Sequence, residues 1–222
     1  MVELAALKAA TAERWQKAKL TRNFIAPAKT LVASKPTYQR VEAKTGVPWF
    51  VIAVIHEREA SQRWDTQLGQ GDPLNKVSVH VPAGRGPFNT WEDGAYDALV
   101  NCAPHAARWT DWTPGGALTL LETYNGEGYA NRGLPSPYVW SGTDQYQKGK
   151  YVRDGRFDPD VVDIQPGCAA LIKTMIALDP SISFGAVKVP EPKSEPKPEP
   201  TLPTGFWSML ISIISAIFRR TK

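Results

Sequence analysis

The sequence predicts a predominantly helical α+β domain with a small β-hairpin region, followed by a proline-rich linker and a C-terminal helix. Several segments carry apolar residues at helical spacing and begin or end at capping residues. Two long glycine-rich segments interrupt them, and a run of Pro, Glu and Lys fills residues 187–204. We therefore expect a main domain over residues 1–186, a linker over 187–204 and a helix over 205–222.

Helix boundaries are indicated by residues with a physical preference for them. Proline suits the first helical position, glycine the residue after the last, and threonine the N-cap. The first helix should end before a turn-like segment around Pro27. On these signals the expected helices are 2–20, 36–46, one that starts at Pro48, one capped by Thr90, one capped by Thr113 and one from Pro159 through CAALIKTMIAL.

Residues 62–87 and 124–158 lack helical periodicity. The first segment contains one alternating run, KVSVHV at residues 76–81, which could form a strand. The second is rich in Gly, Tyr and Asn and is expected to be a loop. Because long irregular segments within a compact domain are usually functional, we expect the two to face each other across a cleft.

Charge and cysteine content limit the partners. The formal net charge is +4 and the pI about 9.0, which suits an anionic partner such as a cell-wall polymer or a membrane surface. No basic stripe interleaved with aromatic residues is present, so a nucleic-acid partner is not expected. Cys102 and Cys168 could form a disulfide or remain two small buried thiols.

The two ends of the sequence bear on location. The N-terminal MVELAALKAATAERWQKAKL lacks the features of a secretory signal, so we expect synthesis in the cytoplasm. Residues 205–222 contain an apolar run of about 14 residues, roughly 21 Å as a helix, whereas a bilayer span needs about 20 residues. An interfacial membrane helix with a basic end fits best. Docking on the main domain, self-association and true spanning are the alternatives.

The stretch VIAVIHEREASQRW (residues 51–64) turns abruptly from apolar to charged. Its His-Glu pair resembles the start of a His-Glu-x-x-His zinc motif, but Ala60 stands where the second His is required. No metal site and no cofactor are therefore expected.

Helical geometry separates the two carboxylates of this stretch. Glu59 continues the stripe of Ile52 and Ile55, whereas Glu57 lies about 160° away and is expected to be solvated or ion-paired. A carboxyl at the edge of an apolar stripe loses hydration, which raises its pKa and suits it to act as a general acid. The alternative is that Glu59 ends the helix facing water.

Two motifs carry a resemblance to a known superfamily. The run TGVPWFVIAVIHEREAS, and LETYNGEGYANRG about 65 residues later, resemble motifs of the lysozyme-like superfamily of goose-type lysozymes and lytic transglycosylases. The likeness covers roughly residues 37–130. Ala60 replaces the usual Ser, and the middle Gly-Leu-Met-Gln motif is absent, with GRGPFNTW (84–91) nearest to its place.

The resemblance implies roles for several residues. Glu59 would be the catalytic acid, Tyr124 would face its carboxyl, and Asn125 would begin a loop that lines the cleft. Asp72, thirteen residues beyond Glu59, resembles the goose-type aspartate that positions water. Asp65 is the other candidate for this second carboxylate, and either aspartate could instead be a turn residue.

Sugar binding needs aromatic faces and hydrogen-bonding groups. The segment SPYVWSGTDQYQKGKY (136–151) supplies both, so Tyr138 and Trp140 are candidate substrate contacts, with the core as their alternative. Gln70 and His80 are further polar candidates, although His80 could be structural.

The implied function is that of a peptidoglycan-degrading lysozyme of the phage endolysin type. It would hydrolyse the β-1,4 bond between N-acetylmuramic acid and N-acetylglucosamine in the cell wall. A lytic transglycosylase, which leaves 1,6-anhydro ends, is the nearest alternative. A non-catalytic wall-binding or membrane-active protein that works through residues 205–222 is the second.

Overall fold

The computed structural model describes residues 3–69, 71–153 and 155–185. Within them, eight α-helices, two 3₁₀ helices and one two-stranded antiparallel sheet confirm a mostly helical fold with a small hairpin. The elements are α1 (Leu4–Lys17), α2 (Ile25–Ala33), α3 (Lys35–Thr45), α4 (Trp49–Ala60), α5 (Trp91–Val100), η1 (Ala106–Arg108), α6 (Pro114–Tyr124), η2 (Ala130–Arg132), α7 (Pro137–Trp140), β1 (Lys150–Arg153), β2 (Arg156–Asp158) and α8 (Cys168–Leu178).

The predicted helix caps are confirmed. The side chain of Thr90 accepts a hydrogen bond from the Asp93 amide at the start of α5, and that of Thr113 accepts one from the Gly116 amide at the start of α6. Gly46 ends α3 in the left-handed conformation, with φ of 73°. Pro48 then immediately precedes α4. These caps determine where α4 and α6 begin, and these two helices carry the motifs that resemble the lysozyme-like superfamily.

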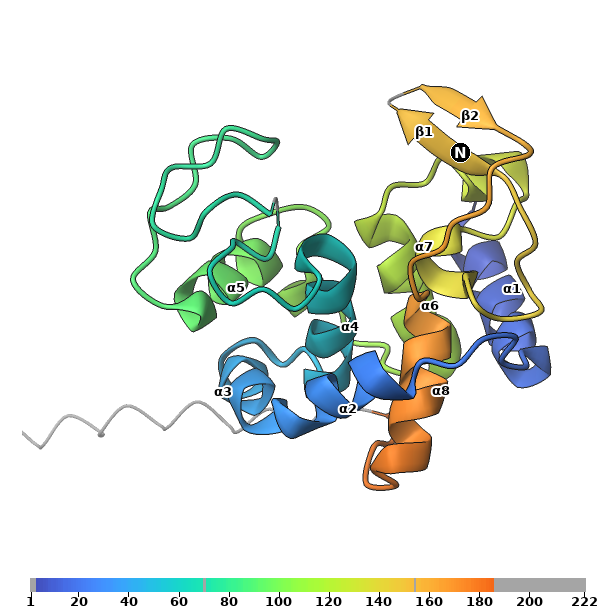
Figure 1. Ribbon diagram of the computed structural model, residues 1–222, viewed down its shortest axis with the longest axis horizontal. Coiled ribbons are helices and arrows are strands. Elements are labelled where there is room, and N and C mark those ends of the chain that lie inside the picture. The colour runs from blue at the N-terminus through green and yellow to red at the C-terminus, as the bar shows by residue number, and fades with distance from the viewer. Residues whose placement is uncertain (1–2, 70, 154, 186–222) are drawn as a thin grey trace, which may run out of the picture. The chain divides into compact units, whose positions relative to one another are not determined.

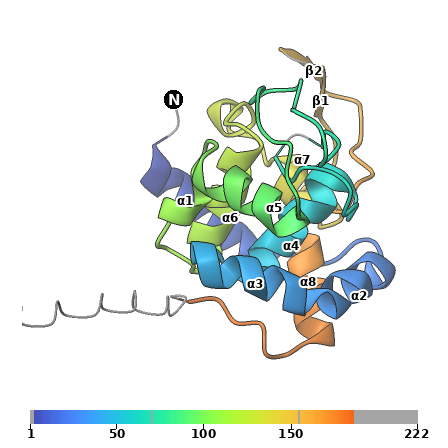
Figure 2. The same ribbon diagram turned by 90° about the vertical axis from the view of Figure 1, so that its left-hand side faces the viewer.

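Helix α4 forms the centre of the core. Residues 49–56 are all buried, so its first two turns contact protein on every side rather than along one stripe. It packs against α2, α3 and α8, which gather beneath it in Figure 2, while α1 packs on α6. Because fully burying a Val or Ile side chain contributes roughly 1.5–3 kcal/mol, this packing holds the helix and the residues at its end in place.

Three sequence predictions of secondary structure are wrong. The turn expected around Pro27 belongs to α2, residues 76–81 are irregular, and the helix expected from Pro159 begins only at Cys168. The hairpin lies instead at residues 150–158, inside the segment expected to be a loop. The sequence Asp154-Gly155 between its strands is a strong hairpin-turn signal that would have located it.

The irregular segments lie around the C-terminal end of α4. Residues 61–90 extend to one side of this end, and the β1–β2 hairpin stands on the other (Figure 1). No helix in the described part of the chain is both long and apolar enough to cross a membrane. The predicted linker (187–204) and C-terminal helix (205–222) lie outside the described residues.

Candidate functional site

Glu59 lies in the last turn of α4 and lines a cavity of about 290 Å³. The end of α4, the irregular segment and the end of α6 meet there, because the other lining residues are Gly69, Val81, Pro82, Cys102, Ala103 and Tyr124. The structure therefore brings Glu59 and Tyr124 to one cavity, as the resemblance implies.

The Glu59 carboxyl is desolvated and held by one donor. Burial raises its pKa, and a hydrogen bond from the Tyr138 hydroxyl to Oε1 (2.8 Å) and the positive charge of Arg58 oppose that rise only in part. The net direction is upward, which is the direction predicted for a carboxyl at an apolar edge. A raised pKa keeps a larger share of the carboxyl protonated near neutral pH.

Arg58 is a site residue that sequence reasoning missed. Its guanidinium carbon lies 4.8 Å from the centre of the Tyr138 ring, and its Nη2 lies 3.1 Å from Asp163 Oδ2. Both charged side chains are nearly buried, with 6% and 1% exposed. The pair packs behind the ring that contacts Glu59. No local signal reveals it, since the partners are 105 residues apart.

Asp163 remains ionised although it is buried. Burial alone would raise its pKa, but the charge of Arg58, with hydrogen bonds from Arg58 and from Lys150 (3.1 Å), lowers it. The carboxylate thus ties β1, through Lys150, to the end of α4, through Arg58.

Tyr124 and Asn125 lie where the chain leaves α6. Burial and the nearby Glu59 charge raise the pKa of Tyr124, so its hydroxyl stays protonated at physiological pH. Asn125 lines a neighbouring cavity of about 390 Å³ together with Arg58 and Tyr138. Tyr138 therefore links Glu59 to this second cavity, because its hydroxyl donates a hydrogen bond to Glu59 and the residue lines the second cavity.

Asp72 holds the loop that reaches the Glu59 cavity. Its Oδ2 accepts hydrogen bonds from the amides of Val79 (2.9 Å) and His80 (3.0 Å), and its Oδ1 accepts one from His80 Nδ1 (2.8 Å). These donors, the His80 amide foremost, lower the pKa of Asp72. Its side chain is 7% exposed, whereas that of His80 is 73% exposed. Val81 and Pro82, which line the cavity, follow directly.

The remaining predicted site residues lie elsewhere. Asp65 is exposed and pairs with Arg63 (3.2 Å), which lowers its pKa, and it is not among the residues that line the Glu59 cavity. Trp140 belongs to the core, the alternative that the sequence left open, and is not a substrate contact, because it is completely buried and donates its indole N–H to Glu122 (2.8 Å). Gln70 lies outside the described residues.

Glu57 and His56 are held within the protein rather than solvated. Glu57 is half-buried and accepts a 2.6 Å hydrogen bond from Gln62, and burial raises its pKa, so the prediction of a solvated or ion-paired residue is wrong. His56 is fully buried between Tyr38 and the Arg63 carbonyl, and burial lowers its pKa to about 4. It is a neutral core residue at physiological pH.

The cysteines are two free buried thiols, which settles the alternative that the sequence left open. Cys102 lines the Glu59 cavity, and burial raises the pKa of its thiol. No group of three or more His, Cys, Asp or Glu side chains that could hold a metal ion occurs among residues 3–69, 71–153 and 155–185.

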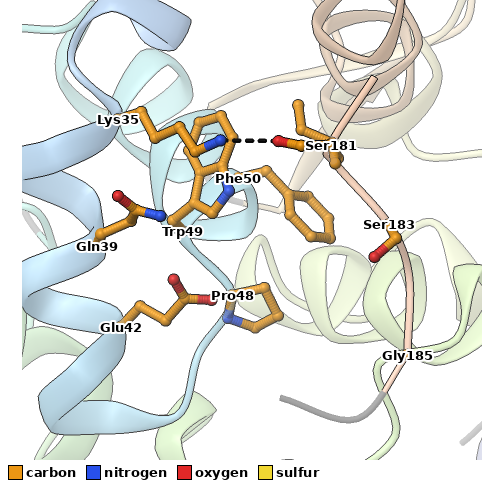
Figure 3. Close-up of a pocket in the computed structure, with 10 residues that line it drawn as sticks. Lys35, Gln39, Glu42, Pro48, Trp49, Phe50, Ser181, Ser183 and Gly185 are labelled. Carbon is orange, nitrogen blue, oxygen red and sulfur yellow. Dashed lines mark hydrogen bonds between the residues drawn. The ribbon is translucent and has the colours of Figure 1, made fainter. Parts of the chain in front are cut away.

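A further hollow of about 330 Å³ lies at the N-terminal end of α4 (Figure 3). Its walls include Glu42, the nearly covered rings of Trp49 and Phe50, and Lys35. The Lys35 ammonium lies over the Trp49 ring and is bound by Asp179 (2.7 Å) and Ser181 (2.9 Å). The hollow is thus separated from Glu59 by the length of α4.

Comparisons of the chain with models of protein families, with curated proteins and with solved structures found no match. The functional argument therefore depends on the site itself.

Proposed function

We propose that this protein is a peptidoglycan-cleaving lysozyme of the endolysin type, with Glu59 as the general acid. The observation that carries the proposal is the Glu59 carboxyl, which is desolvated at the wall of a cavity and has a raised pKa. The substrate is the β-1,4 bond between N-acetylmuramic acid and N-acetylglucosamine in the bacterial wall.

In this mechanism protonated Glu59 donates its proton to the glycosidic oxygen as the bond to the sugar breaks. The Tyr138 hydroxyl donates a hydrogen bond to Glu59 Oε1, which leaves Glu59 Oε2 to carry the proton. The developing positive charge on the sugar ring is then captured by water in a lysozyme. Tyr124, with its protonated hydroxyl on the same cavity, supplies a hydrogen-bonding group for the substrate.

The second candidate is a lytic transglycosylase, in which the 6-hydroxyl of the sugar replaces water and no second carboxylate is needed. One observation favours it: no Asp or Glu besides Glu59 is among the described residues that line the cavity. Asp72 stays the candidate for positioning water in the hydrolase, through the loop that it holds.

The test is mass spectrometry of fragments that the full chain releases from purified peptidoglycan. Fragment ends that have gained water identify the hydrolase, and 1,6-anhydro ends identify the transglycosylase. Glu59→Gln should abolish release. Glu57→Gln is the matched control, because Glu57 is also partly buried with a raised pKa but is not among the residues that line the cavity, and it should keep activity.

A complete lack of fragments from the unaltered chain would overturn the enzyme proposal. It would favour the non-catalytic alternative, in which residues 205–222 act on a membrane or the wall. Lysis of cells by Glu59→Gln at the unaltered rate would point to the same alternative.

A further inference from the structure

The second cavity, of about 390 Å³, adjoins the candidate catalytic residue. Asn125 and Tyr138 line it on the side of Glu59, and the β1–β2 hairpin lines it on the other through Lys150, Tyr151 and Arg153. Because Tyr138 also donates to Glu59, a molecule in this cavity would lie one side chain away from the general acid. The cavity therefore belongs to the surroundings of the cleaved bond.

The charge of this cavity is positive. Arg58, Lys150 and Arg153 are opposed by a single carboxylate among the lining residues, that of Asp163, which leaves an excess of two positive charges. Asp163 already binds Arg58 and Lys150. The Arg153 side chain is exposed and makes no hydrogen bond or ion pair with any side chain or backbone group that the structure describes. An exposed guanidinium without an ion-pair partner can bind a carboxylate of a ligand through two parallel N–H donors.

Arg58 adds a second indication of an incomplete site. Its side chain is only 6% exposed, and its Nε is a buried donor without a hydrogen-bond partner in the described part of the chain. Buried donors are almost always satisfied, so one left open beside a cavity indicates a place for a water or ligand acceptor.

The lining does not match that of a neutral sugar site. Sugar rings stack on exposed aromatic faces, whereas Tyr129 and Tyr138 are 5% and 3% exposed. The third lining tyrosine, Tyr151, is half-buried, and its ring already packs against those of Tyr129 and Phe157. Nor does a neutral sugar need two excess positive charges. At Gly126 no atom lies within 4 Å of the position that a side chain would occupy, so the backbone there leaves room for a short peptide beside the cations.

We propose that this cavity binds the carboxylate-bearing peptide stem of the muramic acid residue whose bond is cleaved, with Arg153 as its main charged contact. The inference rests on the proposed function, since the stem is attached to the sugar beside that bond. It assigns the enzyme a preference for glycan that still carries its peptides.

The first test compares the rates at which the full chain cleaves peptidoglycan with its stems and glycan strands stripped of stems by an amidase. The unaltered protein should prefer the stem-bearing substrate, and Arg153→Glu should reduce the ratio of the two rates by about tenfold, the effect of one charge-assisted contact. Arg156→Gln is the control, because Arg156 lies exposed opposite Arg153 on the partner strand but is not among the residues that line the cavity, and a neutral glutamine cannot form an ion pair with Arg153. It should leave the ratio unchanged.

The second test measures binding without catalysis. The free stem tetrapeptide is titrated calorimetrically into the full chain and into both arginine variants, at low and high salt. Binding should weaken about tenfold in Arg153→Glu and should also weaken with added salt, whereas Arg156→Gln should bind like the unaltered chain.

The outcomes separate the two proposals. If no substrate is cleaved but the peptide binds through Arg153, the cavity assignment stands and the lysozyme proposal fails. If glycan is cleaved with an equal rate for both substrates, or if Arg153→Glu alters neither the ratio nor peptide binding, the peptide-stem inference is overturned.

Discussion

The pKa of Glu59 is set mainly by burial, and two neighbouring side chains partly oppose the effect of that burial. Burial favours the protonated carboxyl, whereas the Tyr138 hydroxyl and the Arg58 charge favour the carboxylate. A general acid works best when its pKa lies near the working pH, so these contacts adjust an effect that burial dominates. In the proposed mechanism Tyr138 is therefore a positioning residue for the general acid.

Tyr138→Phe tests this role. Without the hydroxyl the ionised form of Glu59 loses a hydrogen bond, so its pKa rises further and the alkaline limb of the pH profile of kcat/KM moves to higher pH. Stability should fall by about 1 kcal/mol, the usual contribution of one buried hydrogen bond. Tyr96→Phe, at an exposed tyrosine on α5, is the control. An unmoved alkaline limb would show that Tyr138 does not control the acid.

His56 predicts a loss of stability in mild acid. Its pKa is about 4 in the folded protein against 6.5 for an ordinary histidine, so between these values the unfolded chain binds a proton that the folded chain does not. The free energy of unfolding should therefore be undiminished above pH 6.5 and fall by about 3 kcal/mol as the pH drops towards 4.

Urea unfolding of the unaltered chain and of His56→Gln, from pH 7 to pH 4, measures this effect. The difference between the two proteins isolates His56, because the buried glutamates titrate in both. A difference that does not change with pH would contradict the prediction.

Individual residues of the site were predictable where the signal was local. Glu59 and Tyr124 were predicted from their motifs, and the structure places both at one cavity. The place of Trp140 could not be predicted, because the sequence around an aromatic residue in a polar segment does not show whether its ring faces a cleft or the core. Here the indole donates to the buried carboxyl of Glu122, eighteen residues earlier. The Arg58–Asp163 pair depends on tertiary contact alone.

At the scale of elements, the loop of residues 76–82 is held by the side chains of Asp72 and Ser78. The alternating KVSVHV run forms no strand in the described structure, because the Val79 and His80 amides bind the carboxylate of Asp72 in place of a neighbouring strand. Val81 and Pro82 then reach the Glu59 cavity. Asp72 thus sets the shape of one wall.

Substitution of Asp72 distinguishes a loop anchor from a catalytic carboxylate. An anchor predicts that Asp72→Asn, whose amide oxygen still accepts, stays within about threefold of the unaltered rate, whereas Asp72→Ala loses about a hundredfold through misplacement of the wall. We expect this order, with faster amide exchange at Val79 and His80 in the alanine variant. Equal inactivity of both variants would identify Asp72 as the second catalytic acid.

Prediction of elements succeeded where caps are explicit and failed where they are not. Thr90, Thr113 and Gly46 mark ends that the structure confirms. Helix α2 is not predicted from the sequence, because Pro27 indicates a turn. In the structure Pro27 is the third residue of the helix, where the amide has no partner within the helix.

At the scale of the whole molecule, Met1–Val189 forms a compact unit with its own core. The chain shortened to residues 1–186 should therefore digest purified peptidoglycan within about twofold of the full-length rate, since the described site residues all lie within it. If residues 205–222 form an interfacial helix, the shortened chain should lose activity against whole cells. Turbidity of cells and release of fragments from purified wall measure the two rates. Equal loss on both substrates would show that the terminal segment serves the catalytic unit itself.

In the proposed lysozyme, the contacts around Glu59 also determine how early during synthesis the site can be complete. Tyr138 follows Glu59 by 79 residues, and Asp163 follows Arg58 by 105. At about 5–20 residues per second, the ribosome needs roughly 5–20 s to supply these partners after the acid has been made. Until then Glu59 lacks the Tyr138 donor, and Arg58 lacks Asp163. In the proposed lysozyme, activity would therefore report that nearly the whole domain has been completed.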